Sequence, residues 1–222
     1  MHYGLNASGA KLRQITRSPP RNDVPVPLSN PPFRADHCGS LLRPKHLVEA
    51  RKQYREKTIS EEQLQRIEDG AIRDVVAMQE EIGLAVVTDG EFRRQSYIVD
   101  FYHKVFGKGG LGSEPGLFYH RNDKGDRLPL ERMVVQAPAR REAPIFVDHF
   151  AFLRSITRRT PKITLPSPVI LHFLGGNEAI LRGAYATLDA YWSDITAVYQ
   201  AEIADLYAAG CRYVQIDETS LV

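Results

Sequence analysis

The chain has 222 residues, of which 43% are hydrophobic and 25% are charged. This ordinary balance excludes a protein that is disordered over most of its length. No run of about 18 apolar residues occurs, so we expect no membrane-spanning segment and no membrane partner. Two cysteines, Cys38 and Cys211, are too few for a disulfide scaffold and predict reduced thiols in a cytoplasmic protein.

The formal net charge of +2 arises from the N-terminal segment. Residues 1–32 carry four basic side chains against the single acid Asp23, and they contain six of the 14 prolines. Such a composition cannot bury enough apolar surface to fold, so we predict a disordered arm at 1–32 and one folded domain at 33–222. The domain is nearly neutral and has no basic stripe, which argues against nucleic acid as a partner.

The domain is expected to open with a short strand over 36–42 and a helix over 44–55, with Pro44 in its first turn. Ser60 and Gln63 then form a capping-box pattern, and Gly83 is placed to end the helix that follows. The apolar stripe of this helix has spacings of three or four residues and comprises Leu64, Ile67, Ala71, Val75, Met78 and Ile82.

A helix, a glycine, a short apolar strand and an acid pair occur in this order twice. The first strand, 84–88, leads into Asp89 and Glu91. The second copy has a helix over 189–209, Gly210, and a strand over 213–216, which is followed by Asp217 and Glu218. Short, continuously apolar strands are typical of parallel sheets that are buried on both faces.

The signals between the two copies are weaker. Residues 92–130, rich in glycine and aromatic residues, are predicted to be a long functional or mobile loop. We expect strands at 131–136 and 162–165, and a helix at 148–157 capped by Asp148. Strands near 37, 86, 133, 163 and 214 would alternate with helices, which suits an open doubly wound sheet or a (β/α)8 barrel. The absence of dinucleotide and P-loop motifs favours the barrel: an α/β, TIM-barrel-like fold with about its first five βα units.

Barrel active sites lie at the carboxyl ends of the strands. The polar residues expected at this end are His37, Gly39, Ser40, Arg43, Asp89, Glu91, Arg94, Ser167 and Asp217. Each has a structural alternative: the acids could cap turns, His37 could belong to the core, and Arg93 with Arg94 could be solvated surface. Cys38 is interpreted as a packing residue. No spacing typical of a zinc site occurs, so no metal ligand is assigned.

Three motifs carry a family resemblance: FRADHCGSLLRP at 33–44, EEIGLAVVTDGEFRRQSY at 80–97 and AGCRYVQIDET at 209–219. In this order they resemble the cobalamin-independent methionine synthases, most closely the short single-barrel members. The resemblance implies a methyltransferase of methionine biosynthesis that moves a methyl group from a methyl-folate, including polyglutamylated forms, to the thiolate of homocysteine, with zinc as cofactor. It also implies that Gly39 and Ser40 hold the substrate carboxylate, Glu91 and Asp217 hold its amino group, and His37 matches a motif histidine.

The zinc ligands of that family follow its fifth strand, beyond Val222. We therefore expect a partial barrel that is inactive alone and self-associates through open strand edges. A uroporphyrinogen-decarboxylase-like barrel, with Arg34, Arg43, Arg93 and Arg94 facing substrate acetates, is the enzyme alternative. A non-catalytic partial barrel that binds a partner is the other alternative.

Overall fold

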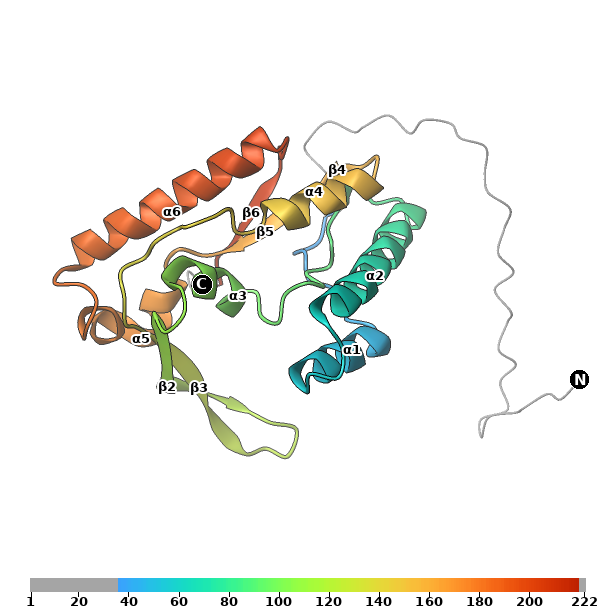
Figure 1. Ribbon diagram of the computed structural model, residues 1–222. Coiled ribbons are helices and arrows are strands. Elements are labelled where there is room, and N and C mark those ends of the chain that lie inside the picture. The colour runs from blue at the N-terminus through green and yellow to red at the C-terminus, as the bar shows by residue number, and fades with distance from the viewer. Residues whose placement is uncertain (1–35, 220–222) are drawn as a thin grey trace, which may run out of the picture.

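The computed structural model describes residues 36–219, so the expected arm at 1–32 and the start of the domain lie outside the described residues. Helices and short strands alternate along most of this range (Figure 1). The elements are α1 (Lys45–Arg55), α2 (Glu61–Glu81), β1 (Val86–Val87), α3 (Val99–Phe106), β2 (Leu111–Arg121), β3 (Arg127–Val135), α4 (Val147–Ile156), β4 (Thr160–Pro161), β5 (Ile163–Pro166), α5 (Ile170–Leu181), α6 (Leu188–Ala208) and β6 (Val214–Asp217).

Parallel strands form the centre of the molecule. β1 pairs in parallel with β4, with Val86 opposite Thr160, and β5 pairs in parallel with β6, with Pro166 opposite Asp217. Only Lys162 separates β4 from β5, so β1 and β6 flank one nearly continuous segment. Helices α2, α4 and α6 contact one another in this order and lie along one side of the strands (Figure 1). Parallel strands covered by connecting helices are the arrangement that the sequence predicts.

Helix α2 begins as predicted. The Ser60 hydroxyl accepts a hydrogen bond from the Gln63 backbone N–H at 3.2 Å, and the Gln63 side chain accepts one from the Ser60 N–H at 2.7 Å. Gly83 follows the helix with a φ of 87°, a left-handed conformation that glycine adopts without strain. Helix α1 also forms as expected, although Pro44 lies at its N-cap, one position before the first turn.

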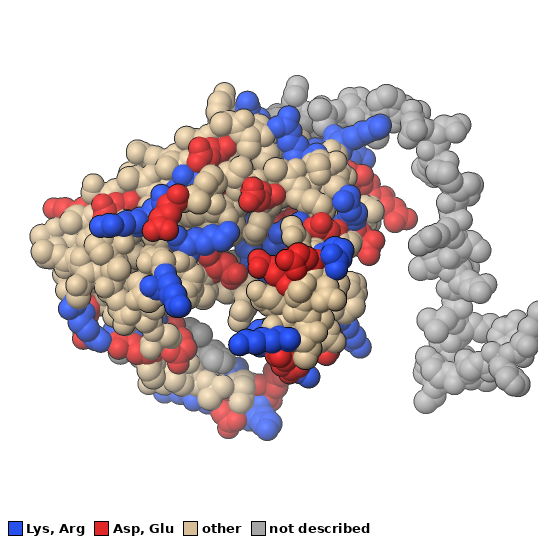
Figure 2. All heavy atoms as spheres, in the orientation of Figure 1, with Lys and Arg blue, Asp and Glu red and all other residues tan. Residues whose placement is uncertain are grey.

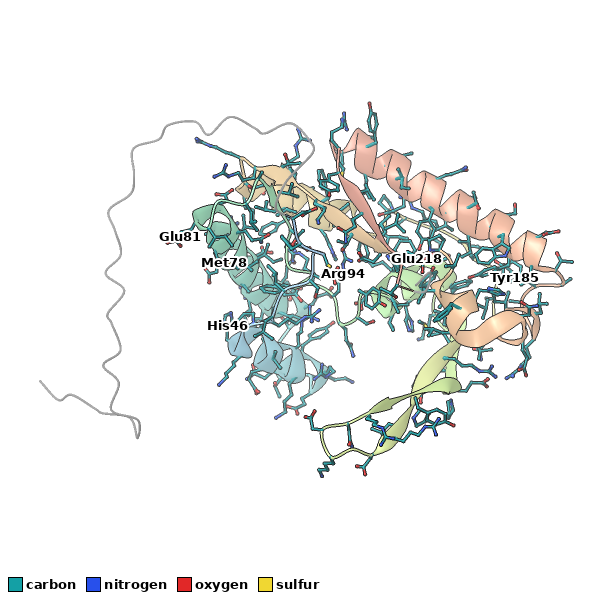
Figure 3. The ribbon with its side chains drawn as sticks, turned by 180° about the vertical axis from the view of Figure 1, so that it is seen from behind. His46, Met78, Glu81, Arg94, Tyr185 and Glu218 are labelled. Carbon is teal, nitrogen blue, oxygen red and sulfur yellow. The ribbon has the colours of Figure 1, made fainter. Side chains whose placement is uncertain are left out.

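The buried face of α2 differs from the predicted stripe. Ala71 and Val75 are buried, but Met78 and Ile82 are 41% and 66% exposed. Figure 3 shows Met78 on the outer side of the helix. Helix α2 contacts α1, β1 and α4, and these contacts bury a face of the helix that lies next to the predicted stripe. This face includes Glu68, Ile72, Val76 and Gln79.

Helix α6 and strand β6 confirm the second copy of the helix–glycine–strand pattern. The Thr187 hydroxyl caps α6 by accepting the Ala190 N–H at 3.3 Å. Gly210 has a φ of 97° and ends the helix as predicted. Within the stripe of α6, Ile203 is 40% exposed, whereas Ile195 and Leu206 are buried.

The predicted strand at 36–42 does not form: this segment has no ladder of backbone hydrogen bonds. Side chains from distant strands hold it instead. The Thr88 hydroxyl donates to the Gly39 carbonyl at 2.7 Å, and the Gln215 amide donates to the Cys38 carbonyl at 2.6 Å. A single backbone bond, from Leu41 N–H to the Gly90 carbonyl at 3.1 Å, joins it to the turn after β1.

In the middle of the chain, one prediction is wrong and one is confirmed only as to the type of element. Residues 92–130 are not one long loop, because they form α3 and β2. The strand expected at 131–136 belongs to β3, which pairs antiparallel with β2, so it is an arm of a hairpin rather than a barrel strand. This hairpin packs against α5 and projects from the body of the molecule (Figure 1). Asp148 lies in the first turn of α4, whose N-cap is Phe146.

Two apolar clusters support the parallel strands. One gathers aromatic and aliphatic side chains from α3, β5 and α6, and it includes Cys211, whose predicted packing role is confirmed. The other joins α1, α2, β1 and α4. Acidic and basic side chains are interspersed over the face shown in Figure 2. Among the described helices, none combines the length and the apolar character needed to cross a membrane.

Candidate functional site

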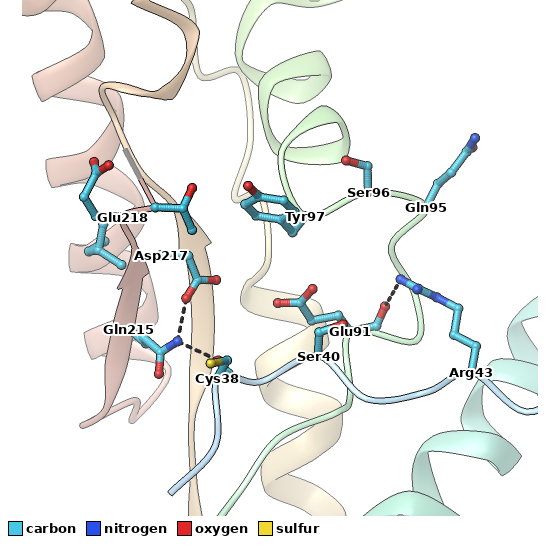
Figure 4. A pocket seen from close by; sticks show the side chains of 12 residues that line it. Cys38, Ser40, Arg43, Glu91, Gln95, Ser96, Tyr97, Gln215, Asp217 and Glu218 are labelled. Carbon is cyan, nitrogen blue, oxygen red and sulfur yellow. Dashed lines mark hydrogen bonds between the residues drawn. The ribbon is translucent and has the colours of Figure 1, made fainter. Parts of the chain in front are cut away.

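A cavity of about 610 Å³ opens at the carboxyl ends of β1 and β6 (Figure 4). Three chain segments meet there: the segment before α1, the loop after β1, and the end of β6 with the residues that follow it. The lining residues are Cys38, Ser40, Arg43, Glu91, Gln95, Ser96, Tyr97, Gln215, Ile216, Asp217, Glu218 and Thr219. The predicted active-site end of the strands is therefore hollow, and most of the residues around the hollow are of polar types.

Glu91 supplies a buried carboxylate to this cavity. Its residue exposure is only 3%, and its backbone has a φ of 59°, which is rare for a residue other than glycine. The Asp89 carboxylate holds this turn by accepting the Glu91 N–H at 2.9 Å. The Glu91 Oε1 atom accepts a hydrogen bond from the Thr164 hydroxyl at 2.5 Å. An uncommon backbone conformation held in place by neighbours is typical of a functional turn.

The arginines that follow Glu91 are not solvated surface. Arg94 is 1% exposed, and its Nη1 lies 3.4 Å from Glu91 Oε1. Arg93 points away from the cavity and forms ion pairs with Glu68 and Asp69 of α2. Arg43 lines the cavity and donates to the Glu91 carbonyl at 3.2 Å. Among these three side chains, only that of Arg43 reaches the cavity wall.

Asp217 brings a second carboxylate from the end of β6. Burial raises its pKa above the usual value, whereas the hydrogen bond from Gln215 and the positive charges of Arg94 and Lys162 lower it. The side chain of Asp217 points toward the cavity in Figure 4, and Gln215 links it to the Cys38 carbonyl. The two carboxylates thus approach one cavity from different strands.

Gly39 and Ser40, the predicted carboxylate-binding turn, differ in their position relative to the cavity. Gly39 is buried with a φ of 131°, and a Cβ atom there would lie 2.5 Å from the Thr164 methyl group, so only glycine fits. Ser40 is exposed and lines the cavity. His37 does not line the cavity: its Nε2 lies 2.9 Å from the Gln79 side-chain oxygen, which matches the core alternative.

Asp89 and Ser167 support the site from behind the cavity wall. Asp89 is 2% exposed and acts as a turn cap, which is the structural alternative that the sequence left open. The Ser167 hydroxyl donates to the Glu218 carboxylate and accepts the Val169 N–H at 3.2 Å. Neither Asp89 nor Ser167 lines the cavity among the described residues.

The interpretation of Cys38 as a packing residue is wrong, because its side chain is exposed and lines the cavity. Sequence reasoning also missed several lining residues. Gln215 could have been found, because positions two apart on a strand share a face and Asp217 was already a candidate. Gln95, Ser96 and Tyr97 continue the loop of Glu91, and no local pattern distinguishes them.

The described residues do not fit a zinc ion. No group of three or more His, Cys, Asp or Glu side chains within 36–219 is placed to hold a metal. The cavity carboxylates are held by hydrogen bonds to Thr164 and Gln215, and Cys38 has no histidine beside it in the lining. We therefore assign no step of any reaction to a metal in this part of the chain.

Residues 35–222 match the protein family described as cobalamin-independent synthase, catalytic domain. The chain belongs to this family. The match covers the cavity, the parallel strands and, apart from Phe33 and Arg34, the three motifs that carry the sequence resemblance.

Similar proteins from other organisms support this membership. The Bacillus subtilis protein YxjH, itself uncharacterized, is 37% identical over 85% of the chain and 48% of its own length. A methionine synthase from Sulfurisphaera tokodaii is 29% identical over 82% of the chain and 51% of its own length. A 5-methyltetrahydropteroyltriglutamate–homocysteine methyltransferase from Synechococcus is 29% identical over 86% of the chain and 24% of its own length. The chain spans about half the length, or less, of the curated relatives it matches.

Solved structures confirm the predicted fold class. A Listeria monocytogenes protein assigned as a vitamin-B12-independent methionine synthase superposes with a TM-score of 0.65 and 30% identity. The superposition covers 85% of this chain and 52% of that protein. A B12-independent methionine synthase from Shewanella, at 23% identity and a TM-score of 0.55, shares the fold. The fold is thus α/β and TIM-barrel-like, and the described residues form part of such a barrel.

Proposed function

We propose that this chain binds homocysteine through its amino-acid moiety, as part of a methyltransferase that uses 5-methyltetrahydrofolate or its polyglutamate forms. The observation that carries the proposal is the meeting of Glu91, Asp217 and Ser40 around one cavity at the strand ends. The family membership and the named methionine synthases among the relatives support the same reaction class.

The cavity suits both charged ends of an amino acid. Glu91 and Asp217 offer two carboxylates to an α-ammonium group, and charge-assisted hydrogen bonds of this kind are stronger than neutral ones. The substrate carboxylate would lie by the turn of Gly39 and Ser40, with the Arg43 guanidinium also at the cavity wall. In the family, zinc activates the homocysteine thiol. The described residues provide no ligand set for it, so we assign them substrate binding only.

The uroporphyrinogen-decarboxylase-like alternative is disfavoured by the arginines. Such a site needs guanidinium groups that face substrate acetates, but Arg93 is paired with α2 and Arg94 is buried against Glu91. Arg43 donates to the carbonyl oxygens of Glu91 and Arg94. Arg34 lies outside the described residues. The non-catalytic alternative predicts a ligand or partner without turnover, and the experiment below also addresses it.

Calorimetric titration of the purified chain with L-homocysteine, at neutral pH with a reductant, tests the proposal. We expect binding that weakens at least tenfold in Glu91→Gln and Asp217→Asn, since a hydrogen bond to a charged group contributes about 1.5–3 kcal/mol. Glu178→Gln is the matched control, because Glu178 lies outside the lining and its side chain is 67% exposed. Unchanged affinity in both cavity variants would refute the assignment.

Metal content and methyl transfer should be measured on the same preparation. We expect no stoichiometric zinc and no turnover of methyl-folate by the isolated chain. Stoichiometric zinc together with methyl transfer would show that residues other than the described ones complete the site. Homocysteine binding without turnover would leave a binding role for this chain, and the size of the particles in solution would then test the expected self-association through strand edges.

The setting of the protein is part of the same proposal. Among the described residues Cys38 and Cys211 are free thiols, which suits a reducing, cytoplasmic compartment. The expectations of a single folded domain over 33–222 and of no nucleic-acid partner stay predictions.

A further inference from the structure

The Glu91 carboxylate needs a compensating charge, because an ionised side chain buried without a partner is costly. Arg94 is the cation that contacts it among the described residues, with Nη1 at 3.4 Å from Oε1. The side chains of both residues are at least 96% buried. They lie three positions apart in one turn, and the Arg94 N–H also donates to the Glu91 carbonyl at 3.0 Å.

A third group, the Thr164 hydroxyl, makes this pair directional. Arg94 Nη1 donates to Thr164 Oγ1 at 3.0 Å, and a guanidinium has no acceptor. The threonine oxygen therefore accepts the hydrogen bond from the arginine, and the threonine hydroxyl donates to Glu91 Oε1, with 2.5 Å between the two oxygens. Both neighbours of Oε1 are thus donors, and together they fix the position of this carboxylate oxygen.

Arg94 is itself held rigidly. Its guanidinium stacks over the Phe146 ring, with the central carbon 4.0 Å from the ring centroid. Its carbonyl oxygen accepts hydrogen bonds from Arg43 and Arg51, both at 2.8 Å. Figure 3 shows Arg94 in the interior of the molecule, between α2 and the strands. These contacts leave the guanidinium little freedom to move away from Glu91.

The buried position of the Arg94 side chain lowers the stability of the fold. Arg94 Nε and Nη2 are buried and have no hydrogen-bond partner among the described residues. A buried cation with unpaired N–H groups destabilises the fold relative to a well-packed apolar side chain of similar size. Such costly charges cluster at functional sites, and this one lies directly behind a cavity-lining carboxylate.

The influence of Arg94 extends to the second carboxylate. Burial raises the pKa of Asp217, and the positive charge of Arg94 is among the influences that lower it. Other charged or titratable groups near the two acids are Arg43, Asp89, Lys162, Glu218 and the Cys38 thiol. Arg93 is directed to α2 and is not among the charges that act on Asp217.

We propose that Arg94 is a positioning residue that acts through Glu91: together with Thr164 it holds the Glu91 carboxylate so that it faces the cavity, and its positive charge also acts on the Asp217 carboxylate. The two acids then form one ammonium-binding pair on separate strands. This inference rests on the proposed function for the identity of the ligand, but the arrangement of Arg94, Thr164 and Glu91 stands without it.

The first test needs no ligand. The side-chain carboxyl carbon of Asp217 is titrated by ¹³C NMR in the original chain, in Arg94→Gln and in the matched control Arg93→Gln. We expect the midpoint to rise by about one pH unit in Arg94→Gln, because a nearby opposite charge lowers a carboxyl pKa by roughly 1–3 units. In the control Arg93→Gln, the Asp217 midpoint should move by less than about 0.2 pH unit, because the charge that is removed there lies outside the site. Equal midpoints in all three proteins would overturn the proposal.

The second test separates charge from geometry through the pH profile of homocysteine binding. Arg94→Gln should weaken homocysteine binding at least tenfold, which is about the effect of losing one charged hydrogen bond. It should also move the acid limb of the binding profile toward neutral pH. Arg94→Lys should restore the limb because it retains the charge. Thr164→Val should weaken binding without moving the Asp217 titration. If the Asp217 midpoint shifts in Arg94→Gln but the original chain does not bind homocysteine, the proposed function is refuted and the role of Arg94 remains.

Should Arg94→Gln fail to fold by circular dichroism, Arg94→Lys and Thr164→Val still test the arrangement. Lysine cannot donate in the fixed fork of a guanidinium, so its affinity should fall while its pH profile stays. Full affinity in both of these variants would contradict a positioning role.

Discussion

Two segments of this protein share one local pattern but present their acids differently. In the first unit, α2, Gly83 and β1 lead to Glu91; in the second unit, α6, Gly210 and β6 lead to Asp217. Both helices have 21 residues, and both glycines have a positive φ. Glu91 is 3% exposed and is enclosed by Arg94 and Thr164, whereas Asp217 is only partly buried.

The difference shows how one local pattern can serve two roles at the same site. The first unit turns sharply through a left-handed residue, so its carboxylate is held by the neighbours of that turn. The second unit continues in strand conformation as far as Asp217, which is held chiefly by Gln215 of the same strand. The first acid is preorganised by its surroundings, and the second remains open to solvent and ligand.

The largest expected effect is on the free energy of unfolding, which should fall by different amounts when the buried glutamates of the two helices are replaced. Glu202 in α6 is fully buried and accepts the backbone N–H groups of Ile145 and Phe146, both at 2.8 Å. Glu202→Ala should lower the free energy of unfolding by about 3–5 kcal/mol, because it leaves buried donors without a partner. Glu68→Ala in α2 should cost only about 1–3 kcal/mol, because Arg51 keeps other acceptors. Urea unfolding followed by circular dichroism would show this, and equal losses would contradict it.

A smaller effect is expected behind the first unit, at Gly39. Gly39→Ala places a methyl group against Thr164 at a positive φ and should cost about 1–3 kcal/mol by overpacking. The matched control is Gly70→Ala in α2, where a Cβ meets nothing within 4 Å. That variant should gain about 0.5–1 kcal/mol, since alanine favours helix over glycine. Thermal unfolding of both variants tests the pair, and a harmless Gly39→Ala would show that Thr164 can yield.

Substitutions at the two helix caps should change the free energy of unfolding by smaller amounts. Ser60 and Gln63 form a reciprocal capping box at α2, whereas Thr187 makes one longer bond at α6. Ser60→Ala should therefore cost about 1 kcal/mol and Thr187→Ala about 0.5 kcal/mol. Denaturant midpoints at constant slope measure both, and the reverse order would mean that tertiary packing rather than capping determines how α2 begins.

The smallest effect, and the one of opposite sign, is expected in the second unit. Asp217→Asn should stabilise the ligand-free chain by about 0.5 kcal/mol at neutral pH, while it removes the carboxylate that we propose binds the substrate ammonium group. Burial raises the pKa of Asp217 in the folded chain, so the folded state binds more protons than the unfolded state between the two pKa values. Stability therefore falls as pH rises through this window, and the asparagine variant escapes that fall. Thermal melts across pH 3 to 7 should converge at the acid end; a gain that persists there would rule out titration as its cause.

Much of the framework could be predicted because it depends on local patterns. The capping box of α2, the glycines that end α2 and α6, and the apolar strands before the acids all use interactions within a few residues. Their alternation predicted parallel strands and a site at the carboxyl ends; the parallel strands are found, and a cavity lies at these ends. The predicted candidates Ser40, Arg43, Glu91 and Asp217 line the cavity.

Other features could not be predicted, because their partners are far away in the chain. Residues 36–42 resemble a strand, but Thr88 and Gln215 side chains replace the ladder. Residues 131–136 resemble a barrel strand, but β2 offers an antiparallel partner nearby. Arg94 resembles surface, and only the meeting of Glu91, Thr164 and Phe146 makes it a buried residue.

The sequence by itself determined where α2 begins, where α2 and α6 end, and where the acids follow the strands. These features depend on capping, backbone preference and apolar periodicity, which act over a few residues. The tertiary structure alone decided which acid is enclosed and which stays open, that Cys38 lines the cavity, and that His37 turns to Gln79. Burial and charge pairing depend on groups from distant strands, and no local pattern encodes which of these groups will meet.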